Sequence, residues 1–483
     1  MGSNRRSFLK LTGLGSLGLF GSSGLFGCST KEEKETMAQA NGPVPRDYKQ
    51  QFNMHGYAAP ALETVRMGIT GLGNRGSGTV MRFASIEGVE IVALSDLEED
   101  RVDSAIKSIE GTNNNPDRYF GGEDEWKKMC ERDDIDLIAI ATPWHLHTDQ
   151  AVFAMEHGKH VYTELPAAQT IDECWRLVET SEKTKRHCVQ MSGSSHEGTS
   201  AIILNMIRQG LFGEVIHGEG GYIHDLMNTH NFNKTMYHNM WRLNENIDRH
   251  GNLYPQHALT PMAQMMDLNY GDQMSYLVSM STNDFQMGEK ARELAAEDEF
   301  WASYVGKDYR GNMNSTLIRT HKGKTLLVQH DVTTPRPGIR FNIIQGTKAT
   351  YHARPGRIGF SYYDDWVPQE EYDKLIEEYT PEITKRFNQM IKEAQRPGRA
   401  DRSYERVNAT DWRLIDCLRN GLPVEMDVYD AALTSAVIPL SEWSVANKSA
   451  PIDVPDFTAG AWKTNKRGMD VALSSGGGNT KIL

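Results

Sequence analysis

The chain has 483 residues, of which 39% are hydrophobic and 24% are charged, and its formal net charge at pH 7 is -12. This composition is typical of a globular protein, and the length is sufficient for two hydrophobic cores. A negatively charged chain does not offer the basic surface that phosphate backbones require, so we expect no nucleic-acid partner and favour small-molecule ligands.

The first thirty residues predict an export signal. Arg5 and Arg6 precede a stretch rich in Leu, Gly and Phe at residues 11–26, which is the pattern of twin-arginine transport. A transmembrane anchor is the alternative, but the stretch is short and rich in Gly and Ser. Residues 25–28 (LFGC) resemble a bacterial lipobox that would leave Cys28 lipidated, unless this cysteine is simply discarded with the signal. We therefore expect a periplasmic protein or a membrane-anchored lipoprotein, with membrane contact only through Cys28.

Residues 31–60 are polar and contain several prolines, without an apolar period, so they are predicted to be a linker. The four remaining cysteines, Cys130, Cys174, Cys188 and Cys417, show no CxxC or CxxH spacing. Unclustered cysteines of this kind indicate buried thiols rather than disulfides or a metal site, and no metal is predicted.

A strand, a glycine turn and a helix begin the first folded domain. The apolar run 65–70 leads into Gly71, Gly73 and Gly76, which form a GxGxxG motif, and a helix-compatible stretch follows. The first glycine permits the tight turn, the second lets the backbone approach a pyrophosphate, and the third allows close packing of helix on strand. This arrangement predicts a dinucleotide site.

Later strands support the same interpretation. The strand 89–95 ends at Asp96, twenty residues beyond Gly76, where a carboxylate can accept the ribose hydroxyls and favours NAD over NADP. Another buried strand, 135–141, is followed by residues 144–147 (WHLH) at its carboxyl end, where open α/β sheets bind ligands. A strand within 158–166 and a capping box at 170–173 continue the alternation. Residues 61–191 are therefore predicted to form an NAD-binding Rossmann domain.

After residue 191 the pattern changes to a helix followed by several strands joined by turns, which predicts an α+β domain at 192–462 with a mostly antiparallel open sheet. Helices are expected at 408–420 and 427–446, packing back on the Rossmann domain. The glycine- and serine-rich end, 463–483, is predicted to be a flexible tail. The fold class is thus α/β, with a second α+β domain whose exposed sheet face suggests a homo-oligomer.

Several motifs resemble the glucose-fructose oxidoreductase, inositol dehydrogenase and rhizopine catabolism (Gfo/Idh/MocA) superfamily across residues 61–460. Within it, the chain most resembles glycoside hydrolase family 109, the NAD-dependent alpha-N-acetylgalactosaminidases. The motifs are 71–76 (GLGNRG), 144–147 (WHLH), 164–166 (ELP), 209–214 (QGLFGE), 222–225 (YIHD), 240–242 (MWR) and 251–257 (GNLYPQH).

The resemblance implies which residues meet each ligand. Those expected at NAD are Gly71, Gly73, Asn74, Arg75, Gly76, Asp96, Trp144, His145, Leu146, His147, Glu164, Leu165 and Gly193. Those expected at a carbohydrate substrate are Tyr222, Arg242, Tyr254, Pro255, Gln256 and His257.

Three positions depart from the related patterns. Leu165 stands where ordinary dehydrogenases of this superfamily carry a lysine that assists hydride transfer, and leucine cannot move a proton. Gly193 begins a Gly-Ser-Ser-His segment in place of an Asn-Cys-Cys-Tyr segment, and Gly338 replaces a substrate-facing tyrosine. The first departure favours hydrolase over dehydrogenase, and the other two indicate a reshaped pocket for a different sugar or linkage.

The resemblance implies redox-neutral glycoside cleavage: oxidation at sugar C3, loss of the C2 proton, elimination of the aglycone, addition of water and return of the hydride. An exported enzyme has no cytoplasmic pool to recycle NADH, which favours this cycle. We assign His257 as the general base and Tyr254 as its partner, because histidine and tyrosine suit proton transfer near neutral pH.

Other interpretations stay open: a net NAD-dependent sugar oxidoreductase, or a non-catalytic sugar-binding lipoprotein. A paired-carboxylate glycosidase is less favoured, since no motif places such a pair. The expected function is therefore an exported NAD-dependent glycosidase acting on alpha-N-acetylgalactosaminides or a related hexoside.

Overall fold

The computed structural model describes residues 46–192, 198–338, 342–362, 364–395 and 403–483. The predicted export signal, the lipobox with Cys28, the first half of the predicted linker and Gly193 lie outside these residues. Within them, no helix is both long and apolar enough to cross a membrane.

The first sheet is parallel throughout and carries the glycine turn. Its six strands follow the order β3-β2-β1-β4-β5-β6, with β1 between β2 and β4. Near-continuous apolar burial along β1 and β4 reflects a sheet covered on both faces, which confirms the predicted Rossmann domain. The strands are β1 (Val65–Thr70), β2 (Val89–Ser95), β3 (Asp117–Tyr119), β4 (Leu137–Ile140), β5 (His160–Thr163) and β6 (Cys188–Gln190).

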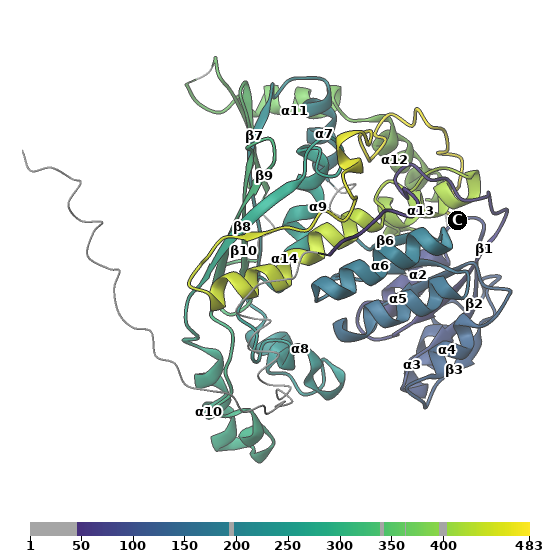
Figure 1. Ribbon diagram of the computed structural model, residues 1–483. Helices are drawn as coiled ribbons and strands as arrows, with labels where there is room; N and C mark the ends of the chain where they lie inside the picture. Colours follow the sequence, from purple (N-terminus) through teal and green to yellow (C-terminus); the bar gives the residue numbers. More distant parts are fainter. Residues whose placement is uncertain (1–45, 193–197, 339–341, 363, 396–402) are drawn as a thin grey trace, which may run out of the picture. The chain divides into compact units, whose positions relative to one another are not determined.

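Helices alternate with these strands, as the sequence predicts. The best-defined start is that of α6, where the Thr170 side chain accepts the Glu173 backbone N–H and the Glu173 side chain accepts the Thr170 N–H, which confirms the predicted capping box. The helices are α2 (Gly76–Phe83), α3 (Glu99–Lys107), α4 (Glu125–Cys130), α5 (His147–Glu156) and α6 (Ile171–Thr184). Figure 1 shows them beside the strands of the first sheet.

The second sheet has eight strands in the order β13-β12-β11-β7-β10-β9-β8-β14. Among the described strands, β7 pairs with β10 in parallel and the other pairings are antiparallel, so the predicted mostly antiparallel sheet is confirmed. The strands are β7 (Val215–Ile223), β8 (Met274–Ser281), β9 (Met313–Thr320), β10 (Thr325–Asp331), β11 (Asn342–Gly346), β12 (Ala349–Ala353), β13 (Gly356–Phe360) and β14 (Ile452–Asp453).

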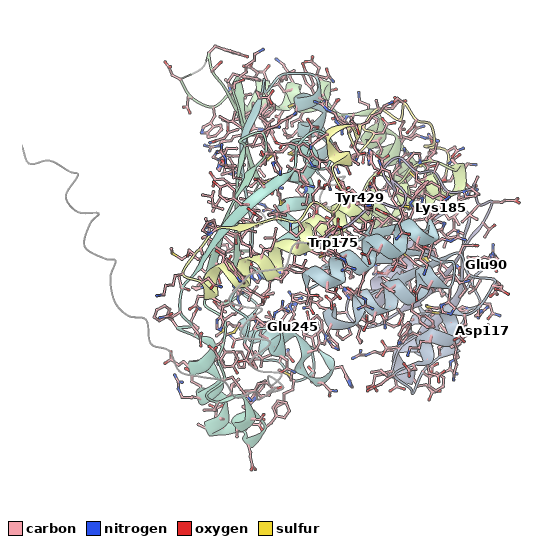
Figure 2. The ribbon with its side chains drawn as sticks, viewed as in Figure 1. Glu90, Asp117, Trp175, Lys185, Glu245 and Tyr429 are labelled. Atoms are coloured by element: carbon pink, nitrogen blue, oxygen red, sulfur yellow. The ribbon has the colours of Figure 1, made fainter. Side chains whose placement is uncertain are left out.

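Two helices connect this sheet to the rest of the core. Helix α9 (Gln256–Met265) packs on β7, where a Cβ at Gly220 would lie 2.8 Å from Ala258 Cβ, so glycine permits the close approach. Helix α14 (Val428–Ala446) contacts β8 of the second sheet and also α6 and β6 of the first. Its buried Tyr429 hydroxyl donates to Glu182 of α6. Figure 2 labels Tyr429 on α14 and Trp175 on α6.

The remaining helices belong to the second part of the chain and surround these elements. They are α7 (Ser200–Arg208), α8 (Trp241–Asn244), α10 (Met287–Glu297), α11 (Gln369–Glu378), α12 (Glu382–Ala394) and α13 (Ala409–Asn420). The ranges of α13 and α14 confirm the two helices expected near the carboxyl end.

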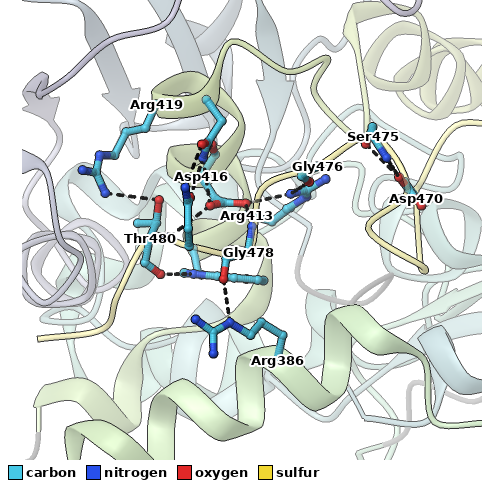
Figure 3. Close-up of polar contacts among 12 residues, drawn as sticks. Arg386, Arg413, Asp416, Arg419, Asp470, Ser475, Gly476, Gly478 and Thr480 are labelled. Atoms are coloured by element: carbon cyan, nitrogen blue, oxygen red, sulfur yellow. Dashed lines mark hydrogen bonds and ion pairs between the residues drawn. The ribbon is translucent and has the colours of Figure 1, made fainter.

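The expectation of a flexible tail at residues 463–483 is wrong in the structure, because the end of the chain packs on α13. Trp412 Nε1 donates to the Thr480 carbonyl at 2.8 Å, and the Asp416 carboxylate accepts the backbone N–H groups of Gly478 and Thr480 at 2.7 and 3.2 Å (Figure 3). Gly478 has a φ of 76°. The glycines that suggested disorder instead supply the left-handed turns that aim backbone donors at Asp416.

Residues 46–60 also differ from a free linker. Arg46 forms ion pairs with Asp172 and Glu179 on α6, and the side chains of Met54 and Ala59 are buried. This half of the predicted linker is therefore part of the folded unit.

Replacing Asp416 with Asn should destabilise the protein by about 1.5–3 kcal/mol, because the buried Arg413 loses one of its two ionic partners, at 2.7 Å, and keeps only Glu425. Urea unfolding measures the change. Glu370→Gln is the control, since it breaks an ion pair with Lys374 in which both side chains are exposed, and should change little. Equal unfolding midpoints for the two variants would show that the docked tail does not contribute to stability.

The protein should also lose stability in acid through His187. Its ring stacks on His160 at 5.1 Å, and burial lowers the His187 pKa to about 4 from an ordinary value of 6.5. The unfolded chain takes up the proton first, so the stabilisation present above pH 6.5 is lost progressively as the pH falls towards about 4.

His187→Leu should therefore flatten this part of the stability profile, measured as the free energy of unfolding at successive pH values. His157→Leu, at an exposed histidine, is the control and should leave the slope unchanged. An unaltered slope in His187→Leu would rule out this histidine as the cause.

Candidate active site

A cavity of about 630 Å³ extends from the glycine turn to the end of β7. It brings together most of the residues that the sequence assigns to two ligands. From the predicted cofactor set it is lined by Gly71, Gly73, Asn74, Arg75, Asp96, Trp144, His145, Leu146, His147, Glu164 and Leu165, and from the predicted sugar set by Tyr222, Arg242 and Tyr254.

The glycine turn is shaped by close backbone contacts. A Cβ at Gly71, whose φ is 80°, would lie 2.6 Å from the backbone of Ala141 and Thr142, and a Cβ at Gly76 would lie 1.7 Å from the Gly71 carbonyl oxygen. Helix α2 begins at Gly76, so its N-terminal N–H groups and positive dipole end lie beside the turn. This is the arrangement that binds a pyrophosphate.

Asp96 fixes the turn against the end of β2. One carboxylate oxygen accepts the Leu72 N–H at 2.6 Å, the other accepts the Glu98 N–H at 3.0 Å, and Arg101 lies 3.8 Å away. Each oxygen keeps a further lone pair for a ribose hydroxyl. A carboxylate here disfavours a 2′-phosphate, so the site fits NAD better than NADP.

His147 connects two loops of the cavity wall. Its side chain is buried, and its two ring nitrogens lie 2.7 Å from the carbonyl oxygens of Thr142 and Pro166. Burial lowers its pKa, so the imidazole is held neutral and donates to one of these carbonyls. The ring thereby ties the loop after β4 to the loop after β5, which carries Glu164 and Leu165.

Aromatic rings form the part of the cavity that the sequence assigns to a sugar. Trp144, from the loop after β4, stacks on Tyr254 with 5.1 Å between ring centroids, and Tyr222 of β7 meets Tyr254 edge-on at 5.0 Å. The Arg242 guanidinium lies over the Trp144 ring at 4.2 Å. Burial raises the pKa of Tyr254 above its ordinary value, so this phenol keeps its proton.

The predicted general base lies directly behind this wall. The His257 ring is buried and parallel to Tyr222, with 4.9 Å between centroids, and it meets the Tyr254 ring at 4.8 Å. Pro255, Gln256 and His257 do not line the cavity themselves, because α9 begins here and turns their side chains inward. The side-chain amide of Gln256 is fully buried and has no hydrogen-bond partner among the described residues.

Sequence reasoning missed the segment between β7 and Arg242 as a cavity wall. Its short helical turns η3 (Met227–Asn231) and η4 (His238–Met240) bring several side chains to the cavity. His238 pairs with Glu98 at 3.2 Å, and Asn74 Nδ2 lies 3.7 Å from the Met236 sulfur, so the segment reaches the nucleotide side. The available signal was the aromatic density beside Arg242. The lining residues are Leu226, His230, Met236, Tyr237, His238, Asn239 and Trp241.

The described part of the chain contains no group of three His, Cys, Asp or Glu side chains placed to hold a metal ion. Cys130, Cys174, Cys188 and Cys417 are all buried and free, which confirms the expected buried thiols. Burial raises the pKa of the Cys130 and Cys188 thiols to about 12, which leaves them unreactive.

Comparison with known proteins places this site in a family. Residues 65–192 match the model of the oxidoreductase family with an NAD-binding Rossmann fold, and residues 198–464 match the C-terminal domain of glycosyl hydrolase 109. An alpha-N-acetylgalactosaminidase from Bacteroides fragilis is 44% identical over 418 residues, covering 86% of this chain and 96% of the relative. The chain belongs to glycoside hydrolase family 109.

A second relative agrees with this assignment, and a solved structure shows the same fold. A glycosyl hydrolase family 109 protein from Shewanella pealeana is 39% identical over 96% of this chain and 98% of its own length. Levoglucosan dehydrogenase, solved with NADH, shares the fold with a TM-score of 0.58 and 16% identity over 81% of this chain and 100% of its own. The family 109 chain described here is an NAD-dependent glycoside hydrolase, and the predicted cofactor is confirmed.

The residues at the cavity fit NAD: a glycine turn at a helix N-terminus, a carboxylate at the end of β2, and Glu164 with Leu165 at the end of β5.

Asp96→Ala should weaken NAD binding roughly tenfold to a hundredfold, which is the effect of losing one or two charged hydrogen bonds. NAD retained through gel filtration, quantified by chromatography after denaturation, measures this. Glu99→Ala, at an exposed neighbour paired with Arg118, should retain NAD as the unaltered protein does. Equal NAD content in both variants would contradict the role of Asp96.

Proposed function

We propose that this family 109 protein hydrolyses glycosidic bonds by a redox-neutral cycle at sugar C3. The observation that carries the proposal is that a leucine, Leu165, lines the cavity next to Glu164, with 3% of its surface exposed. None of the described residues that line the cavity is a lysine. The wall at the end of β5 therefore lacks the protonated amine of a net dehydrogenase, whereas an aromatic sugar wall continues directly from it.

Bound NAD⁺ supplies the capacity to accept a hydride from C3 of the sugar and to return it. Once C3 is a ketone, the C2–H bond is acidified; its proton leaves, the C1–O bond breaks, and the aglycone departs with a proton as an alcohol. Water then adds its oxygen to C1 and a proton returns to C2, after which C3 is reduced and its oxygen protonated. The sum is glycoside plus water to free sugar plus alcohol, with no net oxidation.

The proposed proton-handling residues are Tyr254 and His257. Tyr254 stands in the cavity wall with its phenol protonated, and His257 contacts the rings of Tyr254 and Tyr222 from behind. The Tyr254 hydroxyl at the cavity surface passes the substrate proton on to His257 behind it, which serves as the base. Tyr222 and Arg242 orient the sugar hydroxyls.

The proposed substrate is an alpha-N-acetylgalactosaminide or a related hexoside. The name of the Bacteroides relative supports the first choice. Gly338 supports a modified specificity: a Cβ there would lie 3.2 Å from the His224 ring, so an imidazole occupies the space beside this glycine. A histidine recognises different substituents from a phenol, which favours a different sugar or linkage.

We further propose that the protein is exported by the twin-arginine route and anchored through a lipidated Cys28, as the first residues predict. Its partners would be a carbohydrate substrate and a second copy of the chain. The exposed apolar side chains Ile216, Tyr276, Met280 and Leu317, all on the second sheet, support such an oligomer. Labelling with a palmitate analogue tests the anchor, and light scattering tests the oligomer.

The purified protein, with no cofactor added, should release many aglycones per enzyme from a chromogenic hexoside without net absorbance at 340 nm. A panel of alpha- and beta-linked 4-nitrophenyl hexosides and N-acetylhexosaminides identifies the sugar. Failure to release any aglycone, with NADH accumulating only when NAD⁺ and free sugar are supplied, would overturn the glycosidase and leave a sugar oxidoreductase.

His257→Ala should lower kcat by roughly 10²–10⁴, the usual contribution of a general base, with NAD content unchanged. His217→Ala is a matched control, because His217 lies on β7 but bonds to Thr325 away from the cavity. Full turnover in His257→Ala would show that the base is another group.

A further inference from the structure

The proposed cycle creates a charge that no residue has yet been assigned to stabilise. When the C2 proton leaves a sugar that is a ketone at C3, the electron pair of the C–H bond moves into the C2–C3 bond and onto the C3 oxygen, which becomes an enolate. Such an anion needs a cation or strong hydrogen-bond donor held in advance. Leu165 can provide neither, because its side chain is a hydrocarbon.

Arg242 is held rigidly at the junction of the two halves of the cavity. Its guanidinium carbon lies 4.2 Å from the Trp144 ring, 5.0 Å from the Tyr254 ring and 5.7 Å from the Trp241 ring. Trp144 follows the carboxyl end of β4, where the first sheet binds its ligand, and Tyr254 belongs to the second domain. The backbone before α8 turns sharply to present this side chain, with φ values of 48° at Asn239 and 54° at Met240.

The Arg242 guanidinium has no anionic partner among the residues that the structure describes. It is 9% exposed, lines the cavity, and makes cation–π contacts but neither an ion pair nor a side-chain hydrogen bond with any described residue. A buried cation is costly unless it is paired, and ring faces offset only part of that cost. Its N–H donors are therefore left for a ligand that carries or develops negative charge.

Two other arginines, Arg75 and Arg310, add positive charge near this wall, and the lowered pKa values of two histidines reflect it. The His230 pKa is lowered by burial and then by the nearby Arg242, His224 and Arg75. Deeper in the fold, burial holds the pKa of His330 well below its ordinary value, and the fully buried Arg310 and then Arg242 lower it further. Glu164 is one of the carboxylates that line the same cavity, and it does not form an ion pair with Arg242 among the described contacts.

We propose that Arg242 is a catalytic residue that stabilises the enolate oxygen at C3 during removal of the C2 proton, a step that rests on the proposed function. Arginine keeps its proton throughout, so it acts as a fixed positive donor and not as an acid. The substrate proton goes to the base at His257, the electron pair goes to the enolate, and that pair then expels the aglycone from C1. No external oxidant or reductant takes part in this step.

This role separates Arg242 from a residue that only binds the sugar. A binding residue contributes equally before and after proton removal, so its loss raises KM and leaves the steps of the bound complex unchanged. An enolate-stabilising residue acts only once the ketone has formed. Its loss should leave C3 oxidation intact and slow the C2 step selectively.

The experiment compares Arg242→Met, Arg242→Lys and the unaltered protein, each with its retained NAD, against saturating 4-nitrophenyl alpha-N-acetylgalactosaminide in D₂O. Stopped-flow absorbance at 340 nm follows C3 oxidation, deuterium at C2 of the recovered sugar follows proton removal, and nitrophenol release follows elimination. Arg319→Met, on the exposed face of β9, is the control. Circular dichroism and NAD content check that each variant is folded and loaded.

In Arg242→Met we expect C3 oxidation within threefold of the unaltered protein, whereas C2 exchange and nitrophenol release fall by roughly 10²–10³. Arg242→Lys should recover part of the loss, since the charge is kept and the planar fork is not. A parallel loss of oxidation and exchange, or recovery of both at higher sugar concentration, would make Arg242 a substrate-binding residue and overturn the proposal. Unchanged exchange would overturn it as well.

The result for the unaltered protein distinguishes a failure of the Arg242 proposal from a failure of the redox-neutral cycle on which it rests. If the unaltered protein releases nitrophenol without any transient absorbance at 340 nm or any C2 deuterium, the redox-neutral cycle itself fails, and the role of Arg242 with it. If the unaltered protein shows both signals and Arg242→Met retains them, only the role of Arg242 fails.

Discussion

The stacking of Trp144 on Tyr254 connects the nucleotide-binding domain of this protein to its second domain. Trp144 belongs to the loop that ends β4 in the nucleotide-binding sheet, and Tyr254 precedes helix α9 in the second domain. An offset stack of two large rings contributes about 0.5–1.5 kcal/mol beyond the apolar area that it buries. Its larger consequence is positional, because the same pair of rings carries the Arg242 guanidinium and contacts Tyr222. The nucleotide side and the sugar side are thereby held in one wall.

Much of this arrangement could be predicted from local sequence patterns. The glycines at 71, 73 and 76 and the carboxylate at 96 follow rules set by backbone geometry, so the nucleotide half was predictable residue by residue. The capping box at Thr170 and the helix bounded by Asn408 were predictable for the same reason, since a cap needs particular side chains at fixed offsets. The family motifs then extended the prediction to Tyr222, Arg242 and Tyr254.

Features set by long-range packing could not be predicted in this way. The segment containing Met236 and His238 has no periodic pattern, and its approach to Asn74 and Glu98 depends on how the two sheets are joined. The end of the chain was misinterpreted because Gly and Ser are common both in disordered tails and in tight turns. Contacts with residues more than sixty positions earlier, such as Asp416 and Trp412, distinguish the two cases. Likewise, the motif that contains His257 does not show that α9 turns this ring behind the tyrosines.

Residues 482 and 483 also pack against the nucleotide-binding domain, far from them in the sequence. Ile482 bridges to Ile86 and the Leu483 N–H donates to the Ser85 carbonyl, just beyond the helix that follows the glycine turn. The nucleotide-binding unit therefore lacks one of its neighbours until residues 482 and 483 have been synthesised. Contacts between such distant parts of a sequence slow folding, because the loop between them must first close. The nucleotide domain of this protein thus includes a contact that its own segment of sequence does not supply.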